Sequence, residues 1–418
     1  MAKIVNSANS VLVVGFNTRP LVYSLNKAGY EVYAVDFFGD LDLYPYVKDY
    51  IIITKTLGAD YYLLKDKYKK FLVDFSIEMI RKHKDIRYLI IGSGLDDNLE
   101  ERRSILNEIE KPEYNIISAN NDLEAIRTSR NYKNILKILT SNGYLIPLIF
   151  SYEDYQSDKH ILQYPFILKK RTGSGGINVF KIESEDQLNF IIKMLDLKGF
   201  NPSEWYIQEF IEGIPVSCTT ISNSTECEVI SINRQIIGLK RVNSPKEFMY
   251  CGNIVPANLL KEDYHLISEM AITLSRELGL KGINGFDFVV KDHYPYFMEV
   301  NPRIPGSIRV SETALDLNLL DLHIQSFNPD NWENVKEIIK NPHPIGFATK
   351  LIMFAPKEIK KELLYKINNL EHVHDKTEPI RNVLQEDPLC TILFLGKNFS
   401  DSYFNALKIA DEINRIID

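Results

Sequence analysis

Short apolar runs alternate with amphipathic stretches over the first 120 residues of the chain. Apolar runs of strand length occupy 11–14, 31–35 and 88–91, and apolar residues at helical spacing mark 20–28 and 71–84. Strands and helices that alternate in this way predict a parallel sheet with helices on both faces. Ligands of such sheets collect at the carboxyl ends of the strands.

From residue 164 the pattern changes to short strands and glycine-rich turns. Strands are expected at 166–169, 179–182, 205–211, 216–222, 228–232 and 347–354, and helices at 122–141, 185–195, 261–278 and 400–417. The fold class is therefore α/β and α+β. The expected division is a parallel-sheet domain at 1–120, a second domain at 121–330, and a C-terminal α+β region at 331–418.

Composition and charge limit the partners and the compartment that we expect for the protein. The 418 residues carry a formal net charge of −7 with 25% charged residues, which indicates neither a nucleic-acid nor a membrane partner. No apolar segment is long enough to span a bilayer, and the N-terminus lacks a secretion signal. The cysteines Cys218, Cys227, Cys251 and Cys390 show no metal-ligand spacing. We expect reduced thiols in a cytoplasmic protein.

Two carboxylates and one side-chain amide lie on two expected strands between residues 287 and 301. Glu299 and Asn301 are two residues apart, so their side chains point to the same face of a strand. Asp287 lies on the preceding apolar run, and Asp292 and His293 form the expected turn between the two runs. Carboxylate and amide oxygens are hard ligands that suit Mg²⁺ bridging nucleotide phosphates. The pattern predicts a magnesium site formed by Asp287, Glu299 and Asn301.

A glycine-rich loop, Lys-Lys-Arg-Thr-Gly-Ser-Gly-Gly at 169–176, lies between two expected strands. Glycines let backbone N–H groups approach phosphate oxygens, hydroxyls add donors, and a lysine supplies a point charge. A tight hairpin turn is the alternative for the loop alone, but the downstream carboxylates favour phosphate binding. The predicted phosphate contacts are Lys169, Thr172, Gly173, Ser174, Gly175 and Gly176.

The segment 208–213, Gln-Glu-Phe-Ile-Glu-Gly, follows an apolar strand. Its backbone groups suit the edge of an adenine ring, while Phe210 and Ile211 suit the two faces of the ring. An ordinary edge strand with a turn explains these residues equally well. The candidate nucleotide contacts are Gln208, Glu209, Phe210, Ile211 and Glu212.

Taken in order, these motifs resemble the ATP-grasp superfamily over about residues 125–325. The matching segments are 167–176, 208–213, 285–289 and 299–303, of which the last, Glu-Val-Asn-Pro-Arg, is the most specific. The resemblance implies an ATP-grasp domain at 121–330, made of two α+β subdomains that clamp ATP, with residues 145–205 as a mobile lid subdomain. It implies that the preceding domain at 1–120 is Rossmann-like. It also implies activation of a carboxylate as an acyl phosphate, which a nucleophile then attacks.

Further segments are similar to one branch of that superfamily, described only as predicted ATP-dependent carboligases related to biotin carboxylase. They are residues 15–19, 36–42, 92–94, 213–217 and 387–391. No biotin-carrier signature accompanies them, which disfavours a biotin carboxylase proper.

The resemblance assigns roles to single positions. Lys169 contacts nucleotide phosphates and Arg303 touches the transferred phosphate or the acyl phosphate, so these two are the candidate catalytic residues. Glu209 and Ile211 bracket adenine. ATP and Mg²⁺, with Mn²⁺ as a substitute, are the implied cofactors.

The chain departs from the superfamily pattern at two places. Pro215 stands where many members hold the ribose with an acidic residue, which leaves Glu212 as the substitute. A lysine is absent from the start of the first subdomain helix, and Arg130 or Lys133 is the replacement.

Binding of an anionic substrate is expected from a few further residues near the motifs. They are Arg19, Lys240, Arg241, Ser307 and Arg309. A solvent-facing arginine at a helix entry is the alternative for Arg19. Asp36 ends a strand where a dinucleotide enzyme would hold its ribose, but the loop 15–19 lacks Gly-x-Gly-x-x-Gly.

The leading hypothesis is an ATP- and Mg²⁺-dependent ligase that joins a small carboxylic acid to an amine and releases ADP and phosphate. Carboxylation through carboxyphosphate, a nucleotide-binding regulatory protein without turnover, and a nicotinamide-dependent oxidoreductase are the alternatives. The oligomeric state stays open, with a homodimer as the commonest form for a soluble enzyme.

Overall fold

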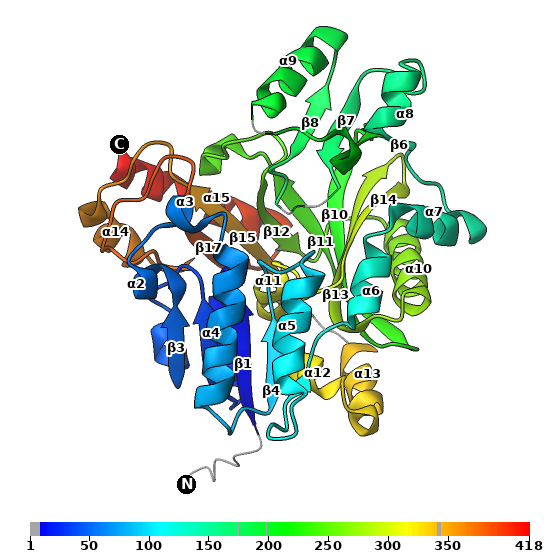
Figure 1. Ribbon diagram of the computed structural model, residues 1–418. Helices are drawn as coiled ribbons and strands as arrows, with labels where there is room; N and C mark the ends of the chain where they lie inside the picture. Colours follow the sequence, from blue (N-terminus) through cyan, green and yellow to red (C-terminus); the bar gives the residue numbers. More distant parts are fainter. Residues whose placement is uncertain (1–8, 172, 174, 198, 341–343) are drawn as a thin grey trace.

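The computed structural model describes residues 9–171, 173, 175–197, 199–340 and 344–418 (Figure 1). The N-terminal part is a five-stranded parallel sheet in the order β3-β2-β1-β4-β5. Its strands are β1 (Ser10–Gly15), β2 (Glu31–Asp36), β3 (Asp49–Ile52), β4 (Tyr88–Ile91) and β5 (Ile117–Ser118).

Helices cover both faces of this sheet because the central strand is apolar at every position between its ends. Val11 and Val13 of β1 face the cluster that contains α1 (Arg19–Lys27), while Leu12 and Val14 face α4 (Tyr68–Lys82). The same part holds η1 (Tyr44–Tyr46), α2 (Ile53–Leu57), α3 (Tyr61–Leu64) and α5 (Leu99–Ile109). This arrangement confirms the expected parallel sheet at the N-terminus.

The second sheet has eight strands in the order β14-β13-β10-β11-β12-β15-β17-β16. All its pairs are antiparallel. Its strands are β10 (Ile214–Asn223), β11 (Cys227–Ile237), β12 (Tyr250–Val255), β13 (Lys281–Lys291), β14 (Tyr294–Asn301), β15 (Phe347–Phe354), β16 (Val373–His374) and β17 (Pro388–Gly396). The last three belong to 331–418, so the C-terminal residues extend the sheet that carries the carboxylate hairpin.

Amphipathic helices bury their apolar faces on this sheet. α10 (Lys261–Glu277) places Ile267, Met270, Ala271 and Leu274 against the β10–β13 side, and α15 (Phe399–Ile417) covers β15 and β17. The remaining helices of this part are η3 (Lys240–Val242), α11 (Ile308–Leu315), α12 (Leu319–Gln325), η4 (Pro329–Asn331), α13 (Trp332–Lys340) and α14 (Lys361–Asn368).

A four-stranded sheet in the order β6-β9-β7-β8 forms a separate layer, at the top of Figure 1. Its aromatic core includes Phe166 and Trp205. Its elements are β6 (Ile149–Ser151), α8 (Tyr152–Ser157), β7 (Phe166–Lys170), β8 (Val179–Ile182), α9 (Glu185–Asp196), η2 (Pro202–Glu204) and β9 (Trp205–Glu209). These elements span the segment expected as the lid.

Several element bounds differ from the sequence prediction. The helix expected at 122–141 is two helices, α6 (Leu123–Ser129) and α7 (Tyr132–Ser141), since Asn131 leaves helical geometry and caps α7 through the N–H of Asn134. Asn competes for backbone donors in this way and favours caps over helix interiors. The strand expected at 205–211 ends at Glu209.

Membrane insertion through a helix finds no support in this fold. Within the described ranges, none of the helices combines the length and apolar composition needed to cross a bilayer.

Candidate active site

The β13–β14 hairpin brings Asp287, Glu299 and Asn301 together. Its turn is formed by Asp292 and His293, both with positive φ, as the twist of a tight hairpin requires. Asp287 lies opposite Glu299 in the register, and the Asn301 amide donates a hydrogen bond of 3.0 Å to the Asp287 carboxylate. The period-two pattern of β14 and the register shift between Asp287 and Phe288 together produce one cluster of side-chain oxygen atoms.

Electrostatics make this cluster suitable for a cation. Burial, followed by the nearby charge of Glu299, raises the pKa of Asp287 to about 7, although the amides of Asn301 and Gln235 donate to its oxygens. Two carboxylates and an amide oxygen fit a hard divalent ion such as Mg²⁺. Across the described residues no group of three or more His, Cys, Asp or Glu could hold a metal, so the amide is essential to this set.

Arg130 connects the N-terminal sheet to the hairpin. It lies in the break between α6 and α7, and its Nη1 donates hydrogen bonds of 2.9 Å to Glu299 and 3.0 Å to the Val300 carbonyl. Its Nε lies 2.5 Å from Asp97, in the loop that follows β4. The sequence predicted Arg130 as a possible phosphate contact. The structure shows that Arg130 donates to Glu299, one of the two carboxylates of the hairpin.

Lys169 approaches the same cluster from the lid. It lies near the end of β7, and its Nζ is 5.0 Å from the ring centre of Tyr206. Burial by itself would lower the pKa of Lys169, but Tyr206, Glu299 and Asp287 raise the pKa above its ordinary value. The ammonium thus stays charged beside the two carboxylates.

The glycine-rich loop packs against the body of the protein. Gly173, Gly175 and Gly176 have positive φ, and a Cβ on Gly176 would lie 1.8 Å from the carbonyl oxygen of Phe248. The Tyr250 N–H donates to the Gly175 carbonyl at 3.3 Å. Only glycine permits this close approach. The predicted contacts Thr172 and Ser174 lie outside the described residues.

The predicted nucleotide segment joins the lid to the body. Glu209 pairs with Leu148 through its backbone N–H and its side chain, Ile211 is buried, Glu212 is exposed, and Lys181 lies 4.7 Å over the Phe210 ring. Gln208 is buried and its Nε2 lies 3.1 Å from the Met298 sulfur. Its Oε1 has no partner among the described residues, so this acceptor is free for a ligand donor.

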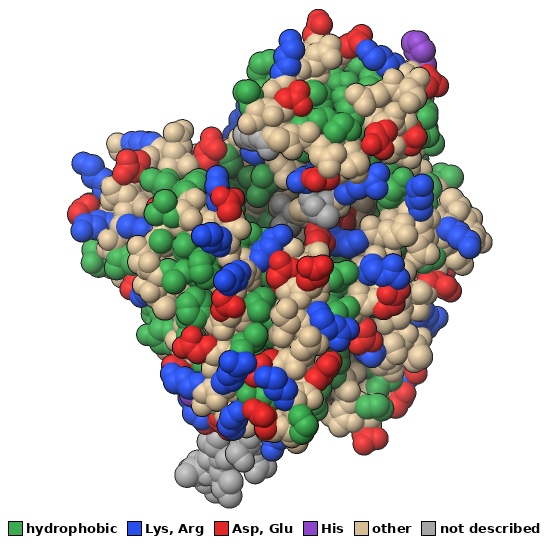
Figure 2. Space-filling model, in the orientation of Figure 1, with side chains coloured by type: hydrophobic (Ala, Val, Ile, Leu, Met, Phe, Trp, Pro, Cys, Tyr) green, Lys and Arg blue, Asp and Glu red, His purple; other side chains and the backbone are tan. Residues whose placement is uncertain are grey.

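A cavity of about 410 Å³ opens beside the break between α6 and α7. It is lined by Arg130, Asn131, Tyr132, Lys133, Arg171 and Tyr206. Tyr132 and Tyr206 stack with ring centres 6.0 Å apart. The space-filling view shows the molecule hollowed below the lid, with charged side chains gathered around the hollow (Figure 2).

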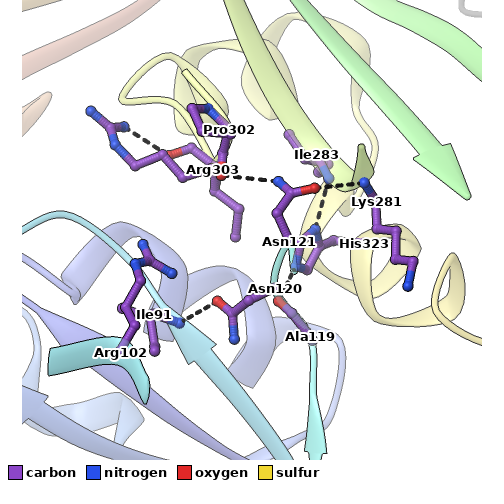
Figure 3. A pocket seen from close by; sticks show the side chains of 11 residues that line it. Ile91, Arg102, Ala119, Asn120, Asn121, Lys281, Ile283, Pro302, Arg303 and His323 are labelled. Carbon is purple, nitrogen blue, oxygen red and sulfur yellow. Dashed lines mark hydrogen bonds between the residues drawn. The ribbon is translucent and has the colours of Figure 1, made fainter. Parts of the chain in front are cut away.

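Arg303 points away from the small cavity beneath the hairpin (Figure 3). It forms an ion pair with Asp96 and donates 3.1 Å to the Ile304 carbonyl, and burial lowers its pKa to about 10. Asn121 supports the adjoining turn, since its amide donates to the Pro302 carbonyl at 2.9 Å. That cavity has a volume of about 10 Å³, the size of one water.

The predicted anion-binding residues are not brought together. Lys240 and Arg241 are exposed, and Arg241 pairs with Asp411 of α15. Ser307 is buried 3.4 Å from Thr219, and Arg309 lies 4.2 Å over the Tyr23 ring.

Arg19 differs from its predicted role. It is 3% exposed and is paired with Asp375 at 2.7 Å and Asp42 at 3.4 Å. Its guanidinium therefore joins the N-terminal sheet to the C-terminal region and is not available for a bidentate contact with a substrate. The sequence had no signal for this pairing, because Asp375 lies far along the chain.

Asp36 also has an internal role. Its two oxygens accept hydrogen bonds from Thr18, Phe38 and Gly39. It closes the loops at the carboxyl ends of β1 and β2, and its oxygens are satisfied without a ribose.

Residues 131–307 match the family model described as an ATP-grasp domain. The matched range contains Lys169, the glycine loop, the segment 208–213 and the hairpin with its carboxylates. The chain therefore contains an ATP-grasp domain at 131–307. The superfamily predicted from the sequence motifs is thereby confirmed.

Similar proteins agree with this ATP-grasp assignment. An uncharacterized protein of Methanocaldococcus jannaschii is 29% identical over 396 residues, which cover 91% of this chain and 89% of that protein. An L-amino acid ligase of Bacillus licheniformis has the same fold, with a TM-score of 0.69, 16% identity and 97% of each chain covered. The ADP complex of an N5-carboxyaminoimidazole ribonucleotide synthetase gives a TM-score of 0.67 at 16% identity, covering 99% of this chain and all of that chain.

Proposed function

We propose that this ATP-grasp protein is an ADP-forming ligase that activates a small carboxylic acid with Mg·ATP and joins it to an amine. The observation that carries the proposal is the convergence of Asp287, Glu299 and Asn301 with Lys169 of the lid. A cation-binding cluster that faces a buried, charged lysine suits transfer of a phosphoryl group. The similar L-amino acid ligase and the ADP-bound synthetase support the same class of reaction.

Nucleotide binding is assigned to the space between the lid and the β13–β14 hairpin. The unpartnered Oε1 of Gln208 would accept a hydrogen bond from an adenine amino group, and Ile211 offers an apolar contact to the ring. Gly173, Gly175 and Gly176 have positive φ, and a glycine backbone without side chains can approach phosphate oxygens closely. The role of Glu212 as a ribose contact stays a prediction.

The metal would be held by Asp287, Glu299 and Asn301. When bound, Mg²⁺ neutralises phosphate charge and makes the terminal phosphoryl group a better electrophile. Arg130 orients Glu299 toward the cluster through the 2.9 Å hydrogen bond, and Gln235 orients Asp287. These contacts preorganise the carboxylates before substrates arrive.

The chain's cations stabilise the charge that develops during transfer. Lys169 neutralises the phosphates from the lid side. Arg303, at the turn after β14, is paired with Asp96, and its contact with the transferred phosphate stays a prediction. An oxygen of the acid attacks the terminal phosphorus, and the bond to the ADP oxygen breaks. The amine nitrogen then attacks the acyl carbon, and phosphate leaves as the amide forms.

Exclusion of water would protect the acyl phosphate. The glycine loop already contacts the body at Phe248 and Tyr250, so the lid sheet covers the space above the carboxylates.

Release of ADP from Mg·ATP, measured against pooled small acids and amines, tests the proposal. We expect ADP release that requires one acid and one amine, and we expect Glu299→Gln to lose at least about 10²-fold in turnover because it removes one ligand charge. Glu337→Gln, an exposed position on α13 with no described partner, is the matched control. Unchanged turnover in Glu299→Gln would exclude the assigned metal site.

A further inference from the structure

Two tyrosines stack across the boundary between the lid and the body of the protein. Tyr206 lies on β9 of the lid sheet, and Tyr132 is the first residue of α7, whose buried face packs in the core of the eight-stranded sheet. The two ring centres are 6.0 Å apart, and the ring planes differ by 19°. Aromatic pairs at this separation attract each other beyond the effect of the area that they bury. The stack therefore joins two layers of the fold through one pair of side chains.

Tyr206 is also the neighbour that fixes Lys169. The two residues lie directly opposite each other on β9 and β7, so their side chains share one face of the lid sheet. The Lys169 Nζ lies 5.0 Å from the centre of the Tyr206 ring, which is a cation–π distance. Among the described residues Lys169 has no ion pair within 4.0 Å, and the charges of Glu299 and Asp287 act on it from farther away. Because the lysine stem is flexible, the ring beside it decides where the ammonium lies.

A second contact holds Tyr132 against the lid. The guanidinium carbon of Arg171, the residue that follows β7, lies 5.7 Å from the centre of the Tyr132 ring. The backbone N–H of Arg171 donates a hydrogen bond of 2.8 Å to the carbonyl of Glu204, which directly precedes β9. The Tyr132 ring thus contacts β9 through Tyr206 and the end of β7 through Arg171. These are the two strands that carry Lys169 and its neighbour.

The same short segment of the body holds a carboxylate of the hairpin. Arg130, two residues before Tyr132, donates a hydrogen bond of 2.9 Å to Glu299. Arg130 and Tyr132 line one cavity together with Arg171 and Tyr206. The break between α6 and α7 is therefore a common support for the lid strand and for the carboxylate below it. A displacement of the stack moves the lid lysine relative to that carboxylate.

We propose that Tyr132 and Tyr206 are positioning residues, whose stack holds Lys169 toward the carboxylate hairpin. The proposal rests on the function proposed above, because the lysine and the carboxylates act there on the phosphates of the nucleotide. Neither tyrosine touches the reacting atoms. A misplacement of about 1 Å can lower a rate by about 10²-fold, so the ring that fixes Lys169 matters although it takes no part in the chemistry.

Nucleotide titrations of the full chain test the stack without turnover. The probes are Mg·ADP and adenosine, which differ in the phosphates that Lys169 would contact. We expect Tyr132→Leu and Tyr206→Leu to bind Mg·ADP about tenfold more weakly and adenosine as the wild type does, because only the contact with phosphate is displaced. Tyr132→Phe retains the ring and should bind both ligands as the wild type does. A stack that merely packs the lid on the body would instead affect both ligands equally.

Two further variants complete the test. The double variant Tyr132→Leu with Tyr206→Leu should lose no more affinity for Mg·ADP than Tyr206→Leu alone, because Tyr132 acts through Tyr206. Tyr365→Leu, at an exposed position of α14, is the matched control and should bind both ligands normally. Tyr132→Met replaces Tyr132→Leu if the latter fails to fold.

The outcomes are distinguishable from those of the proposed function. Equal losses for Mg·ADP and adenosine, additive losses in the double variant, the same loss in Tyr132→Phe as in Tyr132→Leu, or unchanged affinities would each overturn the positioning role. A wild type that binds no Mg·ADP would overturn the proposed function and the positioning role together. A wild type that binds Mg·ADP but releases none from ATP with any acid and amine would overturn only the ligase function.

Discussion

Arg130 lies 2.9 Å from the Glu299 carboxylate, although 169 residues separate the two along the chain. The contact exists because the helix breaks at Asn131, which frees Arg130 to reach both the hairpin and Asp97. One arginine thus ties a ligand of the predicted metal site to the loop that follows β4.

This contact predicts a metal-dependent defect. Arg130→Gln should lower ADP release by about 10- to 100-fold and raise the Mg²⁺ concentration needed for half-maximal activity, because Glu299 loses its orienting partner. Steady-state assays over a range of Mg²⁺ would measure both effects. Arg127→Gln is the matched control, since Arg127 lies in the last turn of α6, near Arg130, and forms an ion pair with the exposed Glu124. Equal effects of the two substitutions would contradict a positioning role.

The glycine loop offers a steric test of lid packing. Gly176→Ala places a Cβ 1.8 Å from the Phe248 carbonyl oxygen, so the loop must move away from the body. We expect at least about a tenfold weaker apparent affinity for ATP with little change in Tm, because the loss is confined to the lid. Gly199→Ala has a similar positive φ and nothing within 4 Å, so it carries only the backbone strain. ATP titrations of both variants would separate the effect of the steric collision with Phe248 from the effect of the strained backbone conformation.

His323 predicts a pH dependence of stability. Its Nδ1 accepts the Ile283 N–H at 2.9 Å and its Nε2 lies 3.0 Å from the Ala119 carbonyl, which defines a neutral ring. Burial lowers its pKa from 6.5 to about 4. Between pH 6.5 and pH 4 the unfolded chain binds more protons at His323 than the folded chain does. The contribution of the neutral ring to the free energy of unfolding is therefore present above pH 6.5 and is lost as the pH falls toward 4.

The expected loss is roughly 3 kcal/mol at most. Tm values measured from pH 7 to pH 4.5 should fall more steeply for the wild type than for His323→Gln, whose amide can accept and donate without titrating. Parallel pH profiles of the two proteins would exclude His323 as the source.

The buried pair of Arg19 and Asp375 predicts non-additive effects. Burial would raise the pKa of Asp375, but Arg19 and Lys350 outweigh burial and bring the pKa to about 2. Asp375→Asn suits the positive φ of this residue and should destabilise the fold by about 3–5 kcal/mol, because it leaves a buried guanidinium underpaired. Adding Arg19→Met should restore part of the lost Tm. A double variant less stable than the single one would contradict this account.

The sequence alone predicts the parts of the site that depend on local periodicity. Alternation on β14 places Glu299 and Asn301 on one face, and the Asp292–His293 turn pairs the two strands. Asp287 comes to lie opposite Glu299 only through a register shift between Asp287 and Phe288, which the sequence did not predict. The alternating strands and helices of the first 120 residues predict the parallel sheet, whose central strand is buried on both faces. These features are determined within a few residues along the chain.

Only the tertiary structure decides which charged side chains pair with one another inside the protein. Arg19 has the sequence context of a ligand-binding arginine, yet Asp42 and Asp375 neutralise it. Lys350 stands in an ordinary strand pattern, yet strand order and the fold bring its charge, together with that of Arg19, close to Asp375. Pairing of charges depends on distances between segments hundreds of residues apart, and no local pattern encodes those distances.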